Sequence, residues 1–187
     1  MKRIIVLIPV MLGLLFFAGC KDSYIGSVDQ SEAVTSQPEQ IASDAHGSAH
    51  MQRNFRTHLT GDQEVPAVET DAQGQATFQV SKDGTSISYK LIVANIENVL
   101  MAHIHLAPAG QNGGVVVWLY PSAPPPQLIE GRSDGVLAEG TITADDLVGA
   151  LAGQTLDDLL NAMKAGNTYV NVHTSQNPPG EIRGQIF

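Results

Sequence analysis

The chain has 187 residues, a formal net charge of −9 at pH 7 and a single cysteine. This length suggests one domain with accessory segments, and the single cysteine excludes a disulfide within the chain. An acidic protein repels phosphate groups, so we exclude nucleic acid as a partner and expect no attraction to anionic lipid headgroups.

The first 19 residues have the pattern of a secretory signal peptide. Lys2 and Arg3 give a positive start, and an apolar stretch follows over residues 4–17. This stretch is shorter than the roughly 20 residues that a membrane-spanning helix needs. Small residues then directly precede Cys20, which resembles the lipobox of bacterial lipoproteins. We therefore expect cleavage before Cys20 and a lipid on its thiol. The alternative is an ordinary signal peptide followed by an incidental cysteine.

Residues 20–52 are predicted to be a lipidated cysteine and a flexible tether, because they are rich in Ser, Gln, Asp, Glu and Ala and show no apolar period. We interpret His46 and His50 as solvated tether side chains, with a metal role as the alternative. The folded domain is expected over residues 53–187. The protein would then be exported and lipid-anchored to the cell membrane or outer membrane, with this domain outside the cytoplasm.

From residue 53 onward the sequence shows short β patterns separated by turns. Strands are expected over residues 55–59, 75–80, 86–93, 101–106, 115–119, 135–142, 169–173 and 181–187. Asp83-Gly84 favours a hairpin turn, and the prolines between 121 and 126 require a loop. Short strands at this spacing are typical of a sandwich or barrel.

Two short helices are predicted before the last two strands. Thr143 and Thr155 can each act as an N-cap, and the acidic pairs Asp145-Asp146 and Asp157-Asp158 that follow them suit the first turn of a helix. The second helix is expected over residues 156–165, with Gly166 as its stop.

The most informative short motif is His103-Ile104-His105. Alternate residues of a strand share a face, so both histidines point away from the core side that Ile104 occupies. The same parity in residues 169–173 turns the valines inward and Tyr169, Asn171 and His173 outward. If the two strands are neighbours, three surface imidazoles can converge on one ion. The alternative is that these histidines are simply exposed or hydrogen-bonded.

Two loops directly follow the histidine strands, at residues 107–114 and 174–180, and we expect them to frame the site unless they are plain hairpin turns. Imidazole nitrogen suits copper, zinc, nickel or iron. Four further residues are candidates for contacts to the ligands: Glu64, Asn171, Glu181 and Arg183. We expect Arg183 to form a cross-strand ion pair with Glu64 or Glu181, or else to attract an anion.

Other chemistries find little support. The sequence contains no G-x-S-x-G, Walker loop, H-E-x-x-H or dinucleotide fingerprint. Trp118 lies in an apolar β run, and we predict that it belongs to the core instead of forming a sugar-stacking platform. A binding module is therefore expected in preference to an enzyme.

Several motifs, in order along the chain, resemble the CHRD domain, which is named from the vertebrate protein chordin and is common in bacterial exported proteins. They are Leu59-Thr60-Gly61-Asp62-Gln63-Glu64-Val65-Pro66, Ala102-His103-Ile104-His105, Asn112-Gly113-Gly114-Val115-Val116, and residues 169–174 with 177–186. Ala67 and Gly114 stand where the family often has proline. The resemblance covers about residues 53–187 and implies an immunoglobulin-like β-sandwich.

The H-x-H strand also resembles the copper-binding strand of Cu,Zn superoxide dismutase, which implies copper at His103, His105 and His173. A second histidine cluster for zinc is missing, as is a disulfide pair. The resulting fold expectation is an all-β, immunoglobulin-like or superoxide dismutase-like Greek-key β-sandwich with two short helices inserted before the penultimate strand.

Three functions stay open at this point. The first is a membrane-anchored lipoprotein that binds a metal ion, with copper preferred over zinc or no metal. The second is an adhesion or scaffold module without metal that binds an envelope protein or a glycan. The third is a redox enzyme of the dismutase type.

Overall fold

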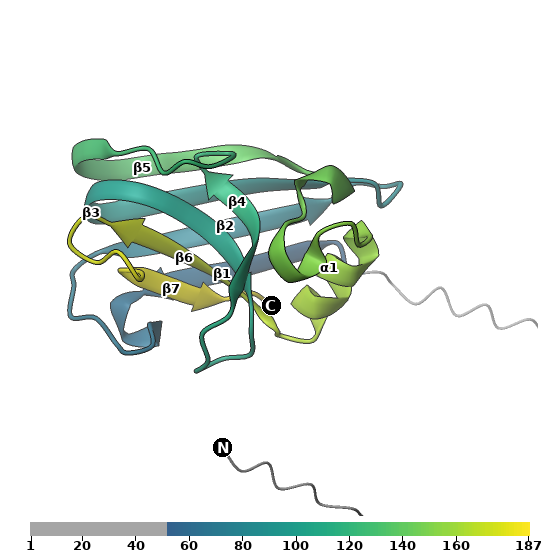
Figure 1. Ribbon diagram of the computed structural model, residues 1–187, viewed down its shortest axis with the longest axis horizontal. Helices are drawn as coiled ribbons and strands as arrows, with labels where there is room; N and C mark the ends of the chain where they lie inside the picture. Colours follow the sequence, from purple (N-terminus) through teal and green to yellow (C-terminus); the bar gives the residue numbers. More distant parts are fainter. Residues whose placement is uncertain (1–51) are drawn as a thin grey trace, which may run out of the picture. The chain divides into compact units, whose positions relative to one another are not determined.

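The computed structural model describes residues 52–187 (Figure 1). The predicted signal peptide, Cys20, His46 and His50 therefore lie outside the described residues. Within residues 52–187, no helix is long and apolar enough to cross a membrane.

The described part of the chain is mostly β-strand, as expected for an all-β fold, and includes one α-helix and three 3-10 turns. The strands are β1 (Asn54–Thr60), β2 (Gln73–Val80), β3 (Ile87–Leu106), β4 (Gly114–Tyr120), β5 (Ile129–Ile142), β6 (Thr168–Thr174) and β7 (Ile182–Gln185). The helix is α1 (Leu156–Lys164), and the 3-10 turns are η1 (Gly61–Gln63), η2 (Ala144–Asp146) and η3 (Gly149–Leu151).

The long strand β3 organises the fold. It is one bent strand of 20 residues, where the sequence patterns predicted two shorter strands. Its first half pairs with β2 and β5, and its second half pairs with β6 and β4. Asn95 and Asn98 take positive φ values of 57° and 53° at register shifts against β5. Such bulges bend a strand, and asparagine tolerates this conformation better than most residues.

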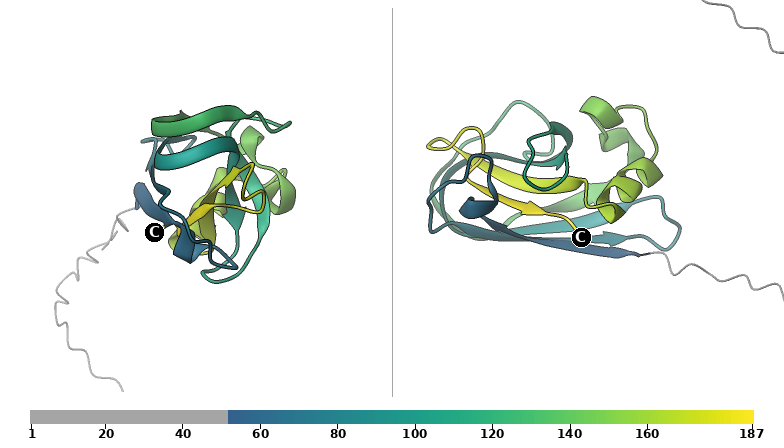
Figure 2. Two further views of the ribbon diagram at one scale, coloured as in Figure 1. Left: turned by 90° about the vertical axis from the view of Figure 1, so that its left-hand side faces the viewer. Right: turned by 90° about the horizontal axis from the view of Figure 1, so that it is seen from below.

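The strands close into a barrel-like arrangement through β3. The hydrogen-bonded order is β2-β1-β7-β6-β3-β4, and β2 also pairs with β3, so the path returns to its start (Figures 1 and 2). The contact between β1 and β7 is short, with Thr60 opposite Arg183. One closed sheet thus replaces the two separate sheets that the sandwich expectation implied.

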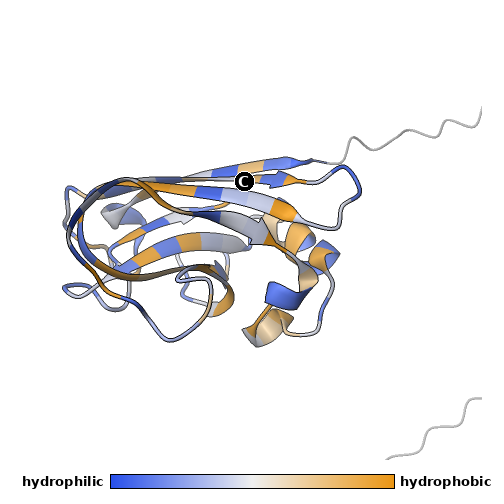
Figure 3. Cartoon of the chain, turned by 90° about the horizontal axis from the view of Figure 1, so that it is seen from above, coloured by the Kyte–Doolittle hydropathy of each residue, from blue (hydrophilic) through white to orange (hydrophobic). Residues whose placement is uncertain are grey.

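The core lies inside this closed sheet. Alternate residues of the strands point inward, and Phe55, Phe78, Leu91, Ile104 and Val170 are among the side chains buried there. Figure 3 shows the corresponding alternation of hydrophobic and hydrophilic positions along the strands. The outward-facing positions of the same strands are therefore available for a site.

The segment between β5 and β6 is helical, as predicted, but only its second part is an α-helix. Thr143 and Thr155 each form a capping box, with Asp146 and Asp158 respectively. The first produces only the turn η2, whereas the second starts α1, which ends one residue earlier than predicted. The apolar side of α1 is buried, and the helix lies beside one end of the strands (Figure 1).

Candidate metal centre

Three histidines come together on the outer face of the strand pair β3–β6. The two strands are antiparallel neighbours, with His103 opposite Asn171 and His105 opposite Tyr169. Ile104, between the two β3 histidines, is fully buried in the core. The predictions that these strands are neighbours and that their histidines share the face opposite the core are therefore confirmed.

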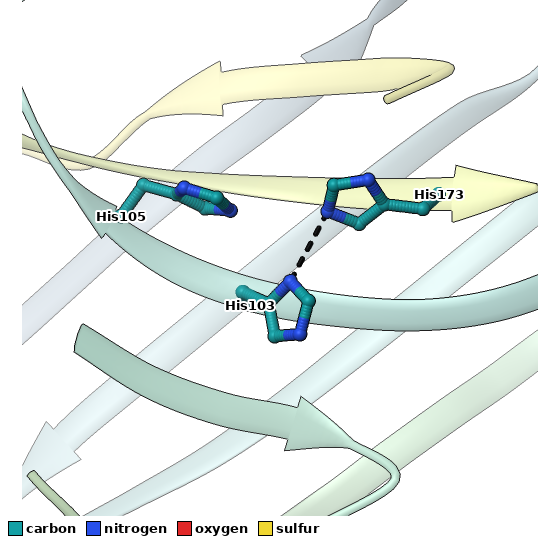
Figure 4. A group of neighbouring side chains, drawn as sticks. All are labelled: His103, His105 and His173. Atoms are coloured by element: carbon teal, nitrogen blue, oxygen red, sulfur yellow. Dashed lines mark hydrogen bonds between the residues drawn. The ribbon is translucent and has the colours of Figure 1, made fainter. Parts of the chain in front are cut away.

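The ring nitrogens of the cluster are close enough to share one ion. His103 Nδ1 lies 3.1 Å from His173 Nε2, and one possible ligand atom from each of the three histidines lies within 4.8 Å of the others. Four-coordinate metal–nitrogen bonds of about 2.0–2.1 Å place neighbouring donors roughly 3.4 Å apart. One pair is close to this spacing, and the ligand atom of His105 lies within 4.8 Å of the other two. Figure 4 shows all three rings turned toward a common space.

The histidines are buried, and the expectation of surface histidines is wrong. His103, His105 and His173 expose only 2%, 7% and 5% of their surface. Strand parity identifies the face that carries a side chain, but it does not reveal what covers that face. Here the cover comes in part from the loops over residues 107–113 and 174–180, which contact the rings as predicted.

Hydrogen bonds to these loops determine which nitrogen of two rings carries the proton. His105 Nδ1 lies 2.9 Å from the carbonyl oxygen of Gly113, and His173 Nδ1 lies 2.8 Å from that of Pro178. A carbonyl oxygen can only accept, so each Nδ1–H donates and each Nε2 keeps a free lone pair. Metal-binding histidines are commonly oriented by this kind of carbonyl contact.

The third ring, His103, presents Nδ1 to the cluster. In the metal-free protein, this Nδ1–H donates to the unprotonated Nε2 of His173. Among the described residues, His103 Nε2 and His105 Nε2 are buried without a hydrogen-bond partner. Leaving a buried polar atom unpaired costs about 1–3 kcal/mol, so the metal-free cluster is not fully satisfied.

The environment keeps the cluster neutral. Burial lowers the pKa of His103 to about 3, and the neighbouring His173 and His105 contribute in the same direction. Burial also lowers the pKa of His173 to about 4 and lowers the pKa of His105. At pH 7 the three rings are therefore neutral, each with one N–H, so an incoming ion does not meet a charged imidazolium. Only the proton on His103 Nδ1 has to move before that nitrogen can bind an ion.

Trp118 belongs to this site and not to the core, contrary to the sequence prediction. It lies opposite His103, and the two ring centroids are 4.2 Å apart with an interplanar angle of 86°. Register shifts between β3 and β4 disturb the alternation, so Val116 and Val117 are both buried and Trp118 falls on the histidine face. A bulge of this kind leaves no clear trace in an apolar run.

Arg183 takes a different role from the predicted ion pair. Its guanidinium lies 3.4 Å from the ring centroid of Tyr169, which is itself stacked on His105 at 4.8 Å and 10°. It donates hydrogen bonds to Gln111 O (2.7 Å) and Asn112 Oδ1 (3.1 Å). Arg183 therefore fastens the 107–113 loop over the site. Sequence reasoning placed Tyr169 on the outer face but did not assign it to the site.

The ion pairs within 4.0 Å among residues 52–187 lie elsewhere, between Lys90 and Glu139 and between Arg132 and Asp134. The alternation of side chains along a strand could not show that uncharged oxygens of the 107–113 loop, and not Glu64 or Glu181, would be the partners of Arg183.

The remaining candidate residues form hydrogen bonds around the histidine cluster and do not belong to it. Asn171 Nδ2 donates to Glu64 Oε1 at 3.2 Å and to Pro179 O at 3.3 Å. Burial raises the pKa of Glu64, although its hydrogen bond to Asn171 opposes that effect. Glu181 accepts hydrogen bonds from the hydroxyls of Thr70 (2.7 Å) and Thr174 (2.6 Å). Glu181 thus holds the base of the 174–180 loop and does not contact the histidines directly.

The fold and the site together define a closed all-β domain with a buried three-histidine cluster on the outer face of its sheet. The chain matches the CHRD domain over residues 55–186, and it belongs to this family. The resemblance drawn from the sequence motifs is thereby confirmed. Comparison with curated proteins and with solved structures found no match. The more distant likeness to Cu,Zn superoxide dismutase stays a prediction.

Proposed function

We propose that this CHRD domain binds one transition-metal ion through His103, His105 and His173. One observation carries the proposal: three buried imidazoles each offer a ligand atom, all within 4.8 Å of one another, while backbone carbonyls orient two of the rings. The described residues supply too few hydrogen-bond donors for the nitrogen lone pairs of these rings, and an ion between the rings would bind such lone pairs.

The donor set favours copper. The three ligands are neutral imidazoles without a carboxylate or a thiolate, and Ca²⁺ and Mg²⁺ prefer oxygen. Imidazole suits copper and zinc, and copper(II) generally binds such sites more tightly than the other divalent ions of the first row. Copper is accordingly the proposed ion, and zinc is the alternative.

The proposed setting is the cell envelope. The sequence of residues 1–20 favours export and lipid attachment at Cys20, which would hold the domain outside the cytoplasm on a membrane. A binding domain there would store, deliver or sense copper. Elemental analysis of the membrane-anchored protein, together with mass spectrometry of its N-terminal peptide, tests both parts of this proposal.

The decisive experiment uses exported protein without a histidine tag, because such a tag would itself bind metal. We expect one ion per chain, and we expect His103→Ala and His173→Ala variants to lose it. His58→Ala is the matched control, since His58 is exposed on β1 and lies outside the cluster.

Trp118 gives a second readout of binding. It is the only tryptophan in the chain, and its ring contacts that of His103, so Cu²⁺ at the cluster should quench its fluorescence. Absence of stoichiometric metal, with no quenching on copper addition, would overturn the proposal and favour the adhesion or scaffold alternative. A superoxide assay on the copper-loaded protein tests the dismutase hypothesis.

A further inference from the structure

Asn171 is a fourth polar side chain on the face that carries the histidines. It lies opposite His103 in the β3–β6 register and two residues before His173 on the same strand. Opposed residues of an antiparallel pair have Cβ atoms about 5 Å apart, and residues two apart on a strand share a face. The Asn171 side chain is therefore within reach of the cluster, and it is 2% exposed.

The hydrogen bonds of Asn171 orient its amide. Both of its observed contacts are made by Nδ2, which donates to the carboxylate of Glu64 and to the carbonyl of Pro179. These acceptors assign the nitrogen end of the amide, so the oxygen points the other way. Among the described residues, Asn171 Oδ1 is buried and has no partner, and the same is true of His105 Nε2.

The backbone around Asn171 leaves room for this orientation. Gly180 has a φ of +143°, and a Cβ at that position would overlap both Glu64 Oε1 and Asn171 Nδ2. Only glycine leaves room for the carboxylate and the amide to meet there. The side chain of Asn171 is thus held with its acceptor oxygen in a buried polar site beside His105, and within residues 52–187 that oxygen has no hydrogen-bond partner of ordinary geometry.

We propose that Asn171 Oδ1 is the fourth donor to the ion, which makes the centre a closed set of three nitrogens and one oxygen. This inference rests on the proposed metal-binding function and deepens it. Catalytic metal sites usually keep a position open for water or substrate, whereas sites that only hold an ion are filled by protein ligands. A closed set would therefore suit a domain that holds copper and does not catalyse a reaction on it.

Spectroscopy of the loaded full-length protein tests the assignment, with Cu²⁺ and Co²⁺ as probes. In the wild type we expect the electron paramagnetic resonance of Cu²⁺ and the visible absorption of Co²⁺ to report four protein donors. Asn171→Leu should still bind one ion through the histidines, but at least tenfold more weakly and with changed spectra.

The chain offers a matched control in Gln185. Its Nε2 also donates to two carbonyl oxygens, those of Ala107 and Gly166, and its Oε1 is also buried without a partner in the described part of the chain. Gln185 holds the first residue of the 107–113 loop but is not part of the histidine cluster, so Gln185→Leu should lower stability and leave the Cu²⁺ and Co²⁺ spectra unchanged.

Asn171→Asp keeps the proposal falsifiable if the leucine variant does not fold. It retains an oxygen donor of the same shape but places a carboxylate against Glu64, so the metal-free variant should melt at a lower temperature than the wild type. Binding of Cu²⁺ should then raise the Tm of the variant by more than it raises that of the wild type. If Asn171 had only a structural role, Cu²⁺ would raise the Tm of the variant and of the wild type by the same amount.

The two proposals fail in different ways. A wild-type protein that binds no ion overturns the metal-binding function itself. A wild-type protein that binds one ion, with unchanged affinity and spectra in Asn171→Leu or equal increments in Asn171→Asp, overturns only the fourth donor.

Discussion

His103 Nδ1 lies 3.1 Å from His173 Nε2, although the two residues are 70 positions apart in the chain. This contact links β3 to β6 on the face opposite the core, and both rings are almost fully buried. Without metal, the two nitrogens share one proton in a hydrogen bond. With metal, both nitrogens would bind the same ion. Metal binding and fold stability should therefore be linked through these two side chains.

The first prediction concerns that linkage. An ion that binds the folded state alone stabilises it by about 2.7 kcal/mol when its free concentration is 100 times the Kd. Thermal unfolding with and without Cu²⁺ should show this gain in the wild type and in His58→Ala. The gain should vanish in His103→Ala. An equal gain in both variants would mean that copper binds outside the cluster.

The second prediction concerns the pH dependence of the metal-free protein. The pKa values of His103 and His173 in the fold are about 3 and 4, below the ordinary value of 6.5 for an unfolded chain. Between these limits the unfolded state binds more protons than the folded state, so the free energy of unfolding falls as the pH falls below 6.5. The loss should be on the order of 1 kcal/mol per histidine per pH unit.

Urea unfolding at pH 7.0 and pH 5.5 measures this dependence in a window where most carboxylates stay ionised. A double variant with phenylalanine at positions 103 and 173 removes both groups and should show a much smaller difference between the two pH values. If the wild type and the double variant lose equal stability, the histidines are not the cause.

The sequence could predict much of this site because strand parity is a local property. Alternation around Ile104 was sufficient to place His103 and His105 on one face, and the valines beside Asn171 did the same for His173. Burial could not be predicted in this way, because it depends on loops whose path is set by distant contacts. The 107–113 loop, for example, is held by Arg183 from the last strand.

The continuity of β3 escaped prediction for a related reason. Residues 94–100 lack a clean alternation, since Asn95 and Asn98 mark bulges where the strand passes from one set of partners to the next. Polar residues in such a stretch indicate a loop by composition. The hydrogen bonds to β5 that keep the strand intact come from a segment 30 or more residues away and have no local signal.

The third prediction tests the role of Arg183 as the fastening of the 107–113 loop. Arg183→Lys removes the planar group that lies on Tyr169 and cannot easily reach both Gln111 and Asn112. We expect a loss of about 1–3 kcal/mol in the free energy of unfolding. Amide hydrogen exchange of the loop should also be faster.

Arg132→Lys is the matched control for that experiment. Arg132 is exposed and pairs with Asp134 on the surface, so its replacement should change stability by less than about 1 kcal/mol. Slow exchange of the loop in Arg183→Lys would show that other contacts suffice to hold it.

The last prediction joins the bend of β3 to the site. Asn98 has a positive φ, and its carbonyl oxygen accepts a hydrogen bond at 3.0 Å from Ser175 N, in the loop that also orients His173. Valine is strained in this conformation by roughly 1–2 kcal/mol, whereas glycine adopts it freely. Asn98→Val should therefore lower the free energy of unfolding and weaken copper binding, because the backbone that supports the loop is displaced.

Asn98→Gly keeps the backbone and should leave the affinity for copper nearly unchanged. Titration of the Trp118 fluorescence with Cu²⁺ measures the copper affinity of both variants. Equal affinities would show that the bend of β3 does not affect the metal centre.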